Sequence, residues 1–234
     1  MTFSADYLRP SSAHADCPEP DLVLFSHNRL IAASLEHFLL AQFPSRRVMK
    51  VCTADAVENI IRASHDARLI AVLPEGGIDA LAQFRTIMPL QRYSQLKLMV
   101  LASAASKGLQ PLLASARWLS LRSSTEQLFR EIQIWLRSPA PSHSSPSLSE
   151  LTPRQYLVLC MLAHGLSLPE VASSLGISVK TVVTHRFDIR TRLGMSCRAD
   201  WLLLCAAVRE CLNYPNSDGM TNFRLGYLYA EENY

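Results

Sequence analysis

Short apolar runs alternate with amphipathic segments between residues 21 and 137, and this alternation predicts β-strands and α-helices in turn. Strands are predicted at Leu22–Phe25, Val48–Cys52, Leu69–Leu73, Leu96–Leu101 and Trp118–Leu121. Helices are predicted at Arg29–Gln42, Ala54–Ser64, Ile78–Met88, Lys107–Ser115 and Thr125–Leu136. Such strand-helix units predict a parallel sheet with helices on both faces, and their number fits a flavodoxin-like doubly wound fold.

Residues 151–212 carry a different pattern, in which helical segments are separated by glycines and by side chains that cap helices. The predicted N-caps of the first three helices are Thr152, Ser167 and Ser178. The glycines that end them are Gly165, Gly176 and Gly194. A fourth helix covers about Arg198–Cys211. Two short helices joined by a tight turn with glycine predict a helix-turn-helix, which can place the third helix in a DNA major groove.

A segment rich in proline and serine separates these two blocks. Ser138–Glu150 holds three prolines and six serines in thirteen residues, which predicts a semi-extended linker without helix. Residues 1–20 are predicted to be a disordered leader. The aromatic tail 213–234 either docks on the first domain or stays disordered. The predicted domains are therefore 21–137 and 151–212.

Composition and charge narrow the function. The chain has 234 residues, of which 49% are hydrophobic and 18% charged, so it is not wholly disordered and has room for two cores. No apolar run approaches the roughly 20 residues of a membrane span. Residues 151–211 hold seven basic and four acidic side chains, a bias that permits nucleic-acid binding without requiring it. The six cysteines form no CxxC pair, and we expect buried, reduced thiols in a cytoplasmic protein.

The string LTPRQ…HGLSLPEVASSLGISVKTVVTHRFDIRTRLGM resembles the C-terminal DNA-binding domain of LuxR/NarL-type regulators. The matching residues include Gly165-Leu166-Ser167, Glu170-Val171-Ala172 and Leu175-Gly176-Ile177-Ser178. The resemblance implies an all-α, four-helix domain whose third helix, about Ser178–Leu193, binds double-stranded DNA. Arginine-rich helices also occur on the surfaces of ordinary globular proteins, so charge alone does not decide the matter.

The predicted third helix has a core side and an outer side, because successive residues turn by 100°. The core stripe consists of Val182, Ile189 and Leu193. Candidate DNA-binding residues are Lys180, Thr181, Val183, Thr184, Arg186, Phe187, Arg190 and Arg192. The basic side chains suit phosphate contacts, whereas Val183 and Phe187 can at best contact thymine methyl groups. We therefore expect affinity to rest on the basic residues and base specificity to be weak.

The first domain resembles the receiver domain of response regulators, which needs an acidic pair after the first strand, an aspartate after the third, a hydroxyl after the fourth and a lysine after the fifth. This chain has Ser26 and His27, Leu73, Ala102 and Arg122 at these positions. Leucine accepts no phosphoryl group, and magnesium requires anionic oxygen ligands. We therefore expect a receiver-like fold without aspartyl phosphorylation; another type of α/β domain is the alternative.

Motifs for catalysis or for metal binding are weak. Gly76-Gly77 lacks the rest of a phosphate-binding loop, and Cys160 with His164 lacks further ligands at typical spacing. We therefore expect no catalytic residues, cofactor or metal. An α/β enzyme with His27 as general base, fused to a DNA-binding domain, is the alternative from another class.

Within the LuxR type, the strings GLSLPEVASSL and HRFDIRTRLGMSCRAD resemble the BglJ and RcsA auxiliary regulators. The resemblance implies a transcription regulator that acts as heterodimer partner of an RcsB-like response regulator; a self-sufficient homodimer is the alternative. In the resembled family the fourth helix pairs DNA-binding domains. Leu202, Leu203, Cys205 and Ala206 serve either such pairing or packing within one domain.

Overall fold

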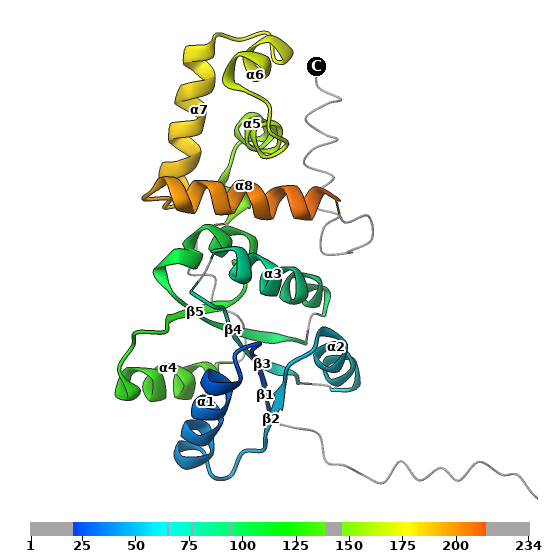
Figure 1. Ribbon diagram of the computed structural model, residues 1–234, viewed down its shortest axis with the longest axis vertical. Helices are drawn as coiled ribbons and strands as arrows, with labels where there is room; N and C mark the ends of the chain where they lie inside the picture. Colours follow the sequence, from blue (N-terminus) through cyan, green and yellow to red (C-terminus); the bar gives the residue numbers. More distant parts are fainter. Residues whose placement is uncertain (1–20, 65, 76, 94, 139–146, 214–234) are drawn as a thin grey trace, which may run out of the picture.

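The strands form one parallel sheet in the order β2-β1-β3-β4-β5 (Figure 1). The computed structural model describes residues 21–64, 66–75, 77–93, 95–138 and 147–213. The strands are β1 Leu22–Phe25, β2 Val48–Val51, β3 Arg68–Val72, β4 Lys97–Ala102 and β5 Arg117–Ser120. Each lies within one residue of its predicted bounds, and neighbouring strands are parallel throughout. The prediction of a flavodoxin-like sheet is confirmed.

Helices cover both faces of this sheet because successive residues of a strand point to opposite sides. Leu22 and Leu24 of β1 pack in a core beneath α1 (Arg29–Gln42) and α4 (Thr125–Arg137). Val23 and Phe25 belong to the core on the other face, beneath α2 (Ala54–Ala63) and α3 (Gly77–Ile87). Burial on both sides explains why the strand reads as a continuous apolar run.

The helix predicted at Lys107–Ser115 differs in type and position. The segment is a 3-10 helix, η2, at Ala104–Leu112. Pro111 lies inside it and has no backbone N–H, so it cannot take part in a regular α-helical hydrogen-bond ladder. A further 3-10 helix, η1 (Met88–Arg92), follows α3 and begins next to Pro89.

The C-terminal domain consists of helices α5 (Pro153–Ala163), α6 (Leu168–Ser174), α7 (Val179–Arg192) and α8 (Arg198–Asn213). The predicted linker is shorter than expected, because its end forms the 3-10 helix η3 (Leu148–Glu150). Ser147 and Glu150 make a capping box there, and Leu148 is buried in the C-terminal core. The predicted leader, residues 139–146 of the linker and residues 214–234 of the predicted tail lie outside the described residues, whereas Asn213 still belongs to α8.

Helix α8 lies between the two domains and packs on both (Figure 1). Leu204 and Val208 belong to the core of the C-terminal domain. Leu203, Ala207 and Cys211 belong instead to the core of the receiver-like domain, where α8 meets α3 and η2. The two alternatives for this helix, pairing or packing inside its own domain, therefore leave out the contact that the structure gives it.

The expectation of buried cysteines is correct for some positions and wrong for others. Cys160 and Cys211 are buried, and burial raises the pKa of each thiol to about 12. Cys52 and Cys197 are exposed, because one follows the edge strand β2 and the other precedes α8. The described cysteines are free thiols.

Among the described residues, helices of a length and apolarity that would cross a bilayer are not found.

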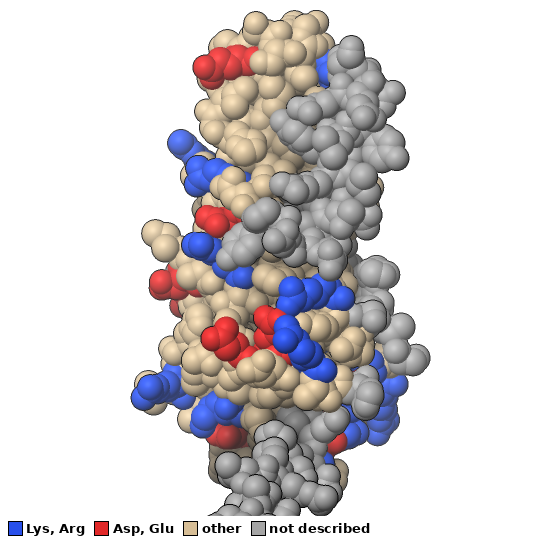
Figure 2. Space-filling model, turned by 90° about the vertical axis from the view of Figure 1, so that its right-hand side faces the viewer, with Lys and Arg blue, Asp and Glu red and all other residues tan. Residues whose placement is uncertain are grey.

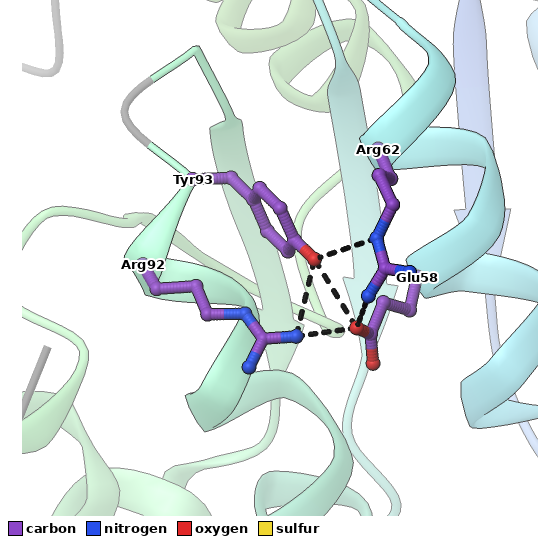
Figure 3. A network of polar contacts seen from close by, with 4 residues as sticks. All are labelled: Glu58, Arg62, Arg92 and Tyr93. Carbon is purple, nitrogen blue, oxygen red and sulfur yellow. Dashed lines mark hydrogen bonds and ion pairs between the residues drawn. The ribbon is translucent and has the colours of Figure 1, made fainter. Parts of the chain in front are cut away.

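A polar network connects α2 with η1. Helix α2 lies on the right of Figure 1, the side that faces the viewer in Figure 2, where basic and acidic side chains lie close together. Glu58 accepts hydrogen bonds from Arg62 at 2.6 Å and from the Tyr93 hydroxyl at 3.1 Å, and it forms an ion pair with Arg92 (Figure 3). Burial alone would raise the pKa of the Glu58 carboxyl, but the Tyr93 hydrogen bond and the charges of Arg92 and Arg62 outweigh it and lower the pKa. The sequence offered no signal for this network, because its members come from two elements.

Candidate nucleic-acid interface

The helix-turn-helix formed by α6 and α7 begins and turns at caps that the sequence predicted. Ser167 and Glu170 form a capping box at the start of α6. Gly176 has φ of +62°, which an L side chain rarely adopts, and the next residue, Ile177, donates its N–H to the Ala172 carbonyl at 3.0 Å. The Ser178 hydroxyl then accepts from the Thr181 N–H at 3.1 Å and starts α7.

Helix α5 holds this turn in place. Its N-cap Thr152 exchanges hydrogen bonds with Gln155 in a further capping box. From the same turn of α5, the Arg154 guanidinium donates to the Leu175 carbonyl at 2.7 Å, at the end of α6. A carbonyl that has no partner within its own helix is thereby satisfied by a neighbouring one. The arrangement of α6 and α7 is thus supported by a hydrogen bond from the Arg154 side chain to the backbone of α6 as well as by the hydrophobic core.

The core side of α7 is the predicted one. Val182 and Ile189 are fully buried, and Leu193, its C-cap, is 1% exposed. They pack with Val171 of α6 and Leu204 of α8 in a single hydrophobic cluster. The prediction of this stripe from helical spacing is confirmed.

The outer side of α7 is open to solvent. Figure 1 shows α7 at the edge of the C-terminal domain, on its left in that view, while the receiver-like domain lies beyond α8. The exposed candidate residues are Lys180, Thr181, Val183, Thr184, Phe187 and Arg192. Arg186 and Arg190 are half-buried. The helix therefore presents a long free face of the kind that enters a major groove.

The basic candidates have different surroundings. Lys180 stands exposed near the start of α7, and Arg186 lies one turn and a half further on. Arg192 reaches back to η3 and donates to the Glu150 carbonyl at 3.1 Å. The Nε of Arg190 is buried without a hydrogen-bond partner among the described residues. Among the basic candidates, Lys180 and Arg186 therefore remain as the ones to which we assign DNA contacts first, because Arg192 hydrogen-bonds within the domain and Arg190 has a buried Nε.

Three threonines of α7 use their hydroxyl groups within the helix. Thr184 Oγ1 donates to the Lys180 carbonyl at 3.1 Å, and Thr191 Oγ1 donates to the Phe187 carbonyl at 3.0 Å. Thr181 Oγ1 lies 2.8 Å from the Ser178 hydroxyl oxygen at the cap. Such bonds from a side chain to the preceding turn are a local alternative to bonding a ligand.

The apolar residues of the outer face form a row. Val179, Val183 and Phe187 are spaced by four residues and are 42%, 39% and 68% exposed. Val183 and Phe187 were predicted from the sequence as candidate DNA-binding residues, whereas Val179 was not. Its exposure follows from the same helical spacing and was in principle readable from the sequence.

The receiver-like domain brings its substituted positions to the same edge of the sheet. Leu73 follows β3 directly, is fully buried, and donates its N–H to the Leu101 carbonyl at 2.8 Å. Ser26 is buried after β1, where its hydroxyl accepts from the Asn28 N–H at 3.1 Å. Ala102 ends β4 and is 6% exposed. These residues supply an apolar wall and a helix-start contact, with no carboxylate for a magnesium ion.

The remaining candidates at this edge are exposed. His27 stacks its ring edge-to-face on Phe25, with the centroids 5.2 Å apart. Arg122 lies after β5, and its N–H donates to the Ser120 hydroxyl at 3.1 Å. In the described part of the chain, groups of three or more metal-binding side chains are not found.

Comparisons with known proteins agree with this architecture. Residues 149–204 match the luxR family of bacterial regulatory proteins, GerE. A structure of two RcsB dimers bound to two parallel DNAs is similar over 82% of this chain and 100% of that chain, at 16% identity and a TM-score of 0.56. RcsB from Salmonella enterica serovar Typhimurium, bound to promoter rprA with BeF3-, covers 80% of this chain and 98% of its own, at 16% identity and a TM-score of 0.55.

Curated protein sequences give no significant match to the chain. At this level of identity, the likeness to RcsB shows a shared two-domain fold, a receiver-like sheet followed by a four-helix domain. The family match covers the helix-turn-helix and its caps. The C-terminal domain of this protein is therefore a LuxR-type DNA-binding domain.

Proposed function

We propose that the protein is a transcription regulator that binds double-stranded DNA by placing α7 in the major groove. The observation that carries the proposal is the free outer face of α7, with exposed Lys180 and half-buried Arg186 on the same helix, in a domain of the LuxR type. Basic side chains along a groove-sized helix neutralise phosphates on either side of it.

Binding of a fluorescent 30-bp duplex at several salt concentrations tests this proposal. The logarithm of affinity falls by roughly 0.9 per neutralised phosphate for each tenfold rise in salt. K180A is expected to bind more weakly on all sequences and to reduce that slope by about one contact. R29A removes an exposed basic residue of α1 and is the matched control, with unchanged binding and slope. Equal slopes in K180A and the parent protein would contradict the role given to Lys180, and absence of binding at low salt would refute the proposal.

We further propose that the receiver-like domain works without aspartyl phosphorylation. Buried Leu73 at the end of β3 supports this, because it fills with hydrocarbon the place where a phosphoacceptor would stand. Incubation with acetyl phosphate and magnesium, followed by intact mass measurement, is expected to leave the mass unchanged. A stoichiometric gain of about 80 Da in residues 21–137, one phosphoryl group, would overturn this part.

The partner we propose is an RcsB-like response regulator in a heterodimer, as the resemblance to auxiliary regulators implies. One side of α8 already packs on the receiver-like domain through Leu203, Ala207 and Cys211. Contacts between α8 and a partner would therefore use another side of this helix, where Leu202 is exposed. Sizing the protein alone and mixed with such a regulator, with and without promoter DNA, distinguishes a heterodimer from the alternative homodimer. A mixture that elutes as two separate species under all conditions would exclude the heterodimer.

A further inference from the structure

The row of Val179, Val183 and Phe187 is an unusual surface for a helix that meets a polar groove. Exposed large apolar residues are few in the described chain, and three of them stand four residues apart on this one helix. Phe187 is 68% exposed and is not a member of the hydrophobic core of the C-terminal domain. Side chains of this kind cannot donate to or accept from a base edge.

Charge on both sides of the row points to nucleic acid as its occupant. With 100° between successive residues, Lys180 lies on one flank of the row and Arg186 lies on the other, whereas Arg190 falls within the angular range of the row itself. An apolar strip between cations matches a major groove, whose phosphate rails are anionic and whose floor carries the C5-methyl groups of thymine.

The threonines of the same face strengthen this argument. Thr184 and Thr191 donate their hydroxyl protons to carbonyls of the preceding turn. Base acceptors in the groove therefore find few donors here, and Lys180 is the exposed side chain best able to supply one. The outer face of α7 is therefore better suited to apolar contact with thymine methyl groups than to hydrogen bonding with base edges.

We propose that Val183 and Phe187, with Val179 at the start of the helix, recognise thymine through its methyl group, so that the protein selects DNA by apolar contact. The proposal rests on the proposed function, since α7 must lie in the major groove. It also revises the expectation of weak base specificity: selectivity would come from methyl groups in place of hydrogen bonds.

The experiment replaces thymine by uracil, which removes the methyl group and keeps the base pair. Duplexes with 20 random base pairs are selected on the full-length protein at low salt, and the enriched duplex is resynthesised with uracil at each thymine in turn. Uracil is expected to weaken binding roughly fourfold at one or two positions, the value for about one buried methyl group. Other thymines are expected to show no effect.

Variants then assign the contact to a side chain. F187A is expected to reduce the preference for thymine over uracil to about onefold at one of these positions, which is the coupling that a double-mutant cycle measures. L30A removes an apolar residue that is 80% exposed on α1, and is the matched control that retains the preference. Because Phe187 is largely exposed, its replacement is expected to leave folding unchanged, which circular dichroism checks.

The possible outcomes separate this inference from the function on which it rests. Absence of binding to any duplex overturns both. Binding without an enriched sequence, or an enriched duplex that tolerates uracil everywhere, overturns the inference alone. The inference also fails if F187A weakens binding to thymine and uracil duplexes equally, or affects only association with a response regulator.

Discussion

Gly108 of η2 lies tightly against the start of α8, where the two domains meet. A Cβ atom at this position would lie 2.3 Å from the Asp200 carbonyl oxygen and 3.0 Å from the Leu204 backbone nitrogen. Both are main-chain atoms, so rotation of a side chain cannot relieve the contact. G108A therefore requires α8 to move away from η2, and this movement loosens the packing of Leu203.

The magnitude follows from two opposing effects. Overpacking of a tight contact destabilises a protein by about 1–3 kcal/mol. Replacement of glycine by alanine also restricts the unfolded chain, which offsets about 0.4–1 kcal/mol. We expect a net loss of about 1–2 kcal/mol in the free energy of unfolding. With a urea m-value of about 2 kcal/mol/M, the midpoint falls by about 0.5–1 M.

Urea unfolding followed by tryptophan fluorescence measures this change, with Trp201 of α8 as a reporter near the contact. A105S alters an exposed residue of the same 3-10 helix and is the control, with an unchanged midpoint. The larger variant G108L is expected to separate the domains, seen as a greater radius of gyration in X-ray scattering with the helical circular dichroism retained. A midpoint in G108A equal to that of the parent protein would refute the close approach of η2 and α8.

Three further predictions concern stability and reactivity. The folded-state pKa of Glu58 is lowered, so its stabilising effect is present above the ordinary carboxyl pKa of 4.5 and is lost as the pH falls through the lower folded value. E58Q should therefore lower the urea midpoint at pH 7, and this difference should shrink below pH 4.5 and vanish once the pH is below the folded-state pKa; a difference that stays constant into acid would contradict the network. I189A should cost about 2–5 kcal/mol because it empties a fully buried site, whereas exposed V183A should cost less than about 0.5 kcal/mol, as thermal melts would reveal. At pH 8, Cys52 should react with a thiol reagent much faster than buried Cys160, whose pKa is about 12; peptide mapping after a short pulse reads this out, and equal labelling would speak against the packing.

Prediction from the sequence succeeded where one local rule decides the structure. The caps Thr152, Ser167 and Ser178 form the predicted bonds, because each needs only a neighbour three residues away. Prediction was less good at η2, where Pro111 changes the helix type, and at η3, where Leu148 finds a core that no local rule reveals. The exposed Cys52 and Cys197 were misjudged because burial depends on neighbours from elsewhere in the chain.

The sequence by itself determined the two secondary-structure patterns, the glycine-ended helix-turn-helix and the loss of a carboxylate at Leu73. These features depend on residue identity and on periods of two or 3.6 residues, which are properties of the chain as written. Only the tertiary structure decided that α8 bridges the domains, that Gly108 permits their contact, and that Glu58 joins Arg92 and Tyr93. Each of these contacts joins surfaces from distant segments, and their complementarity exists only once both domains have folded.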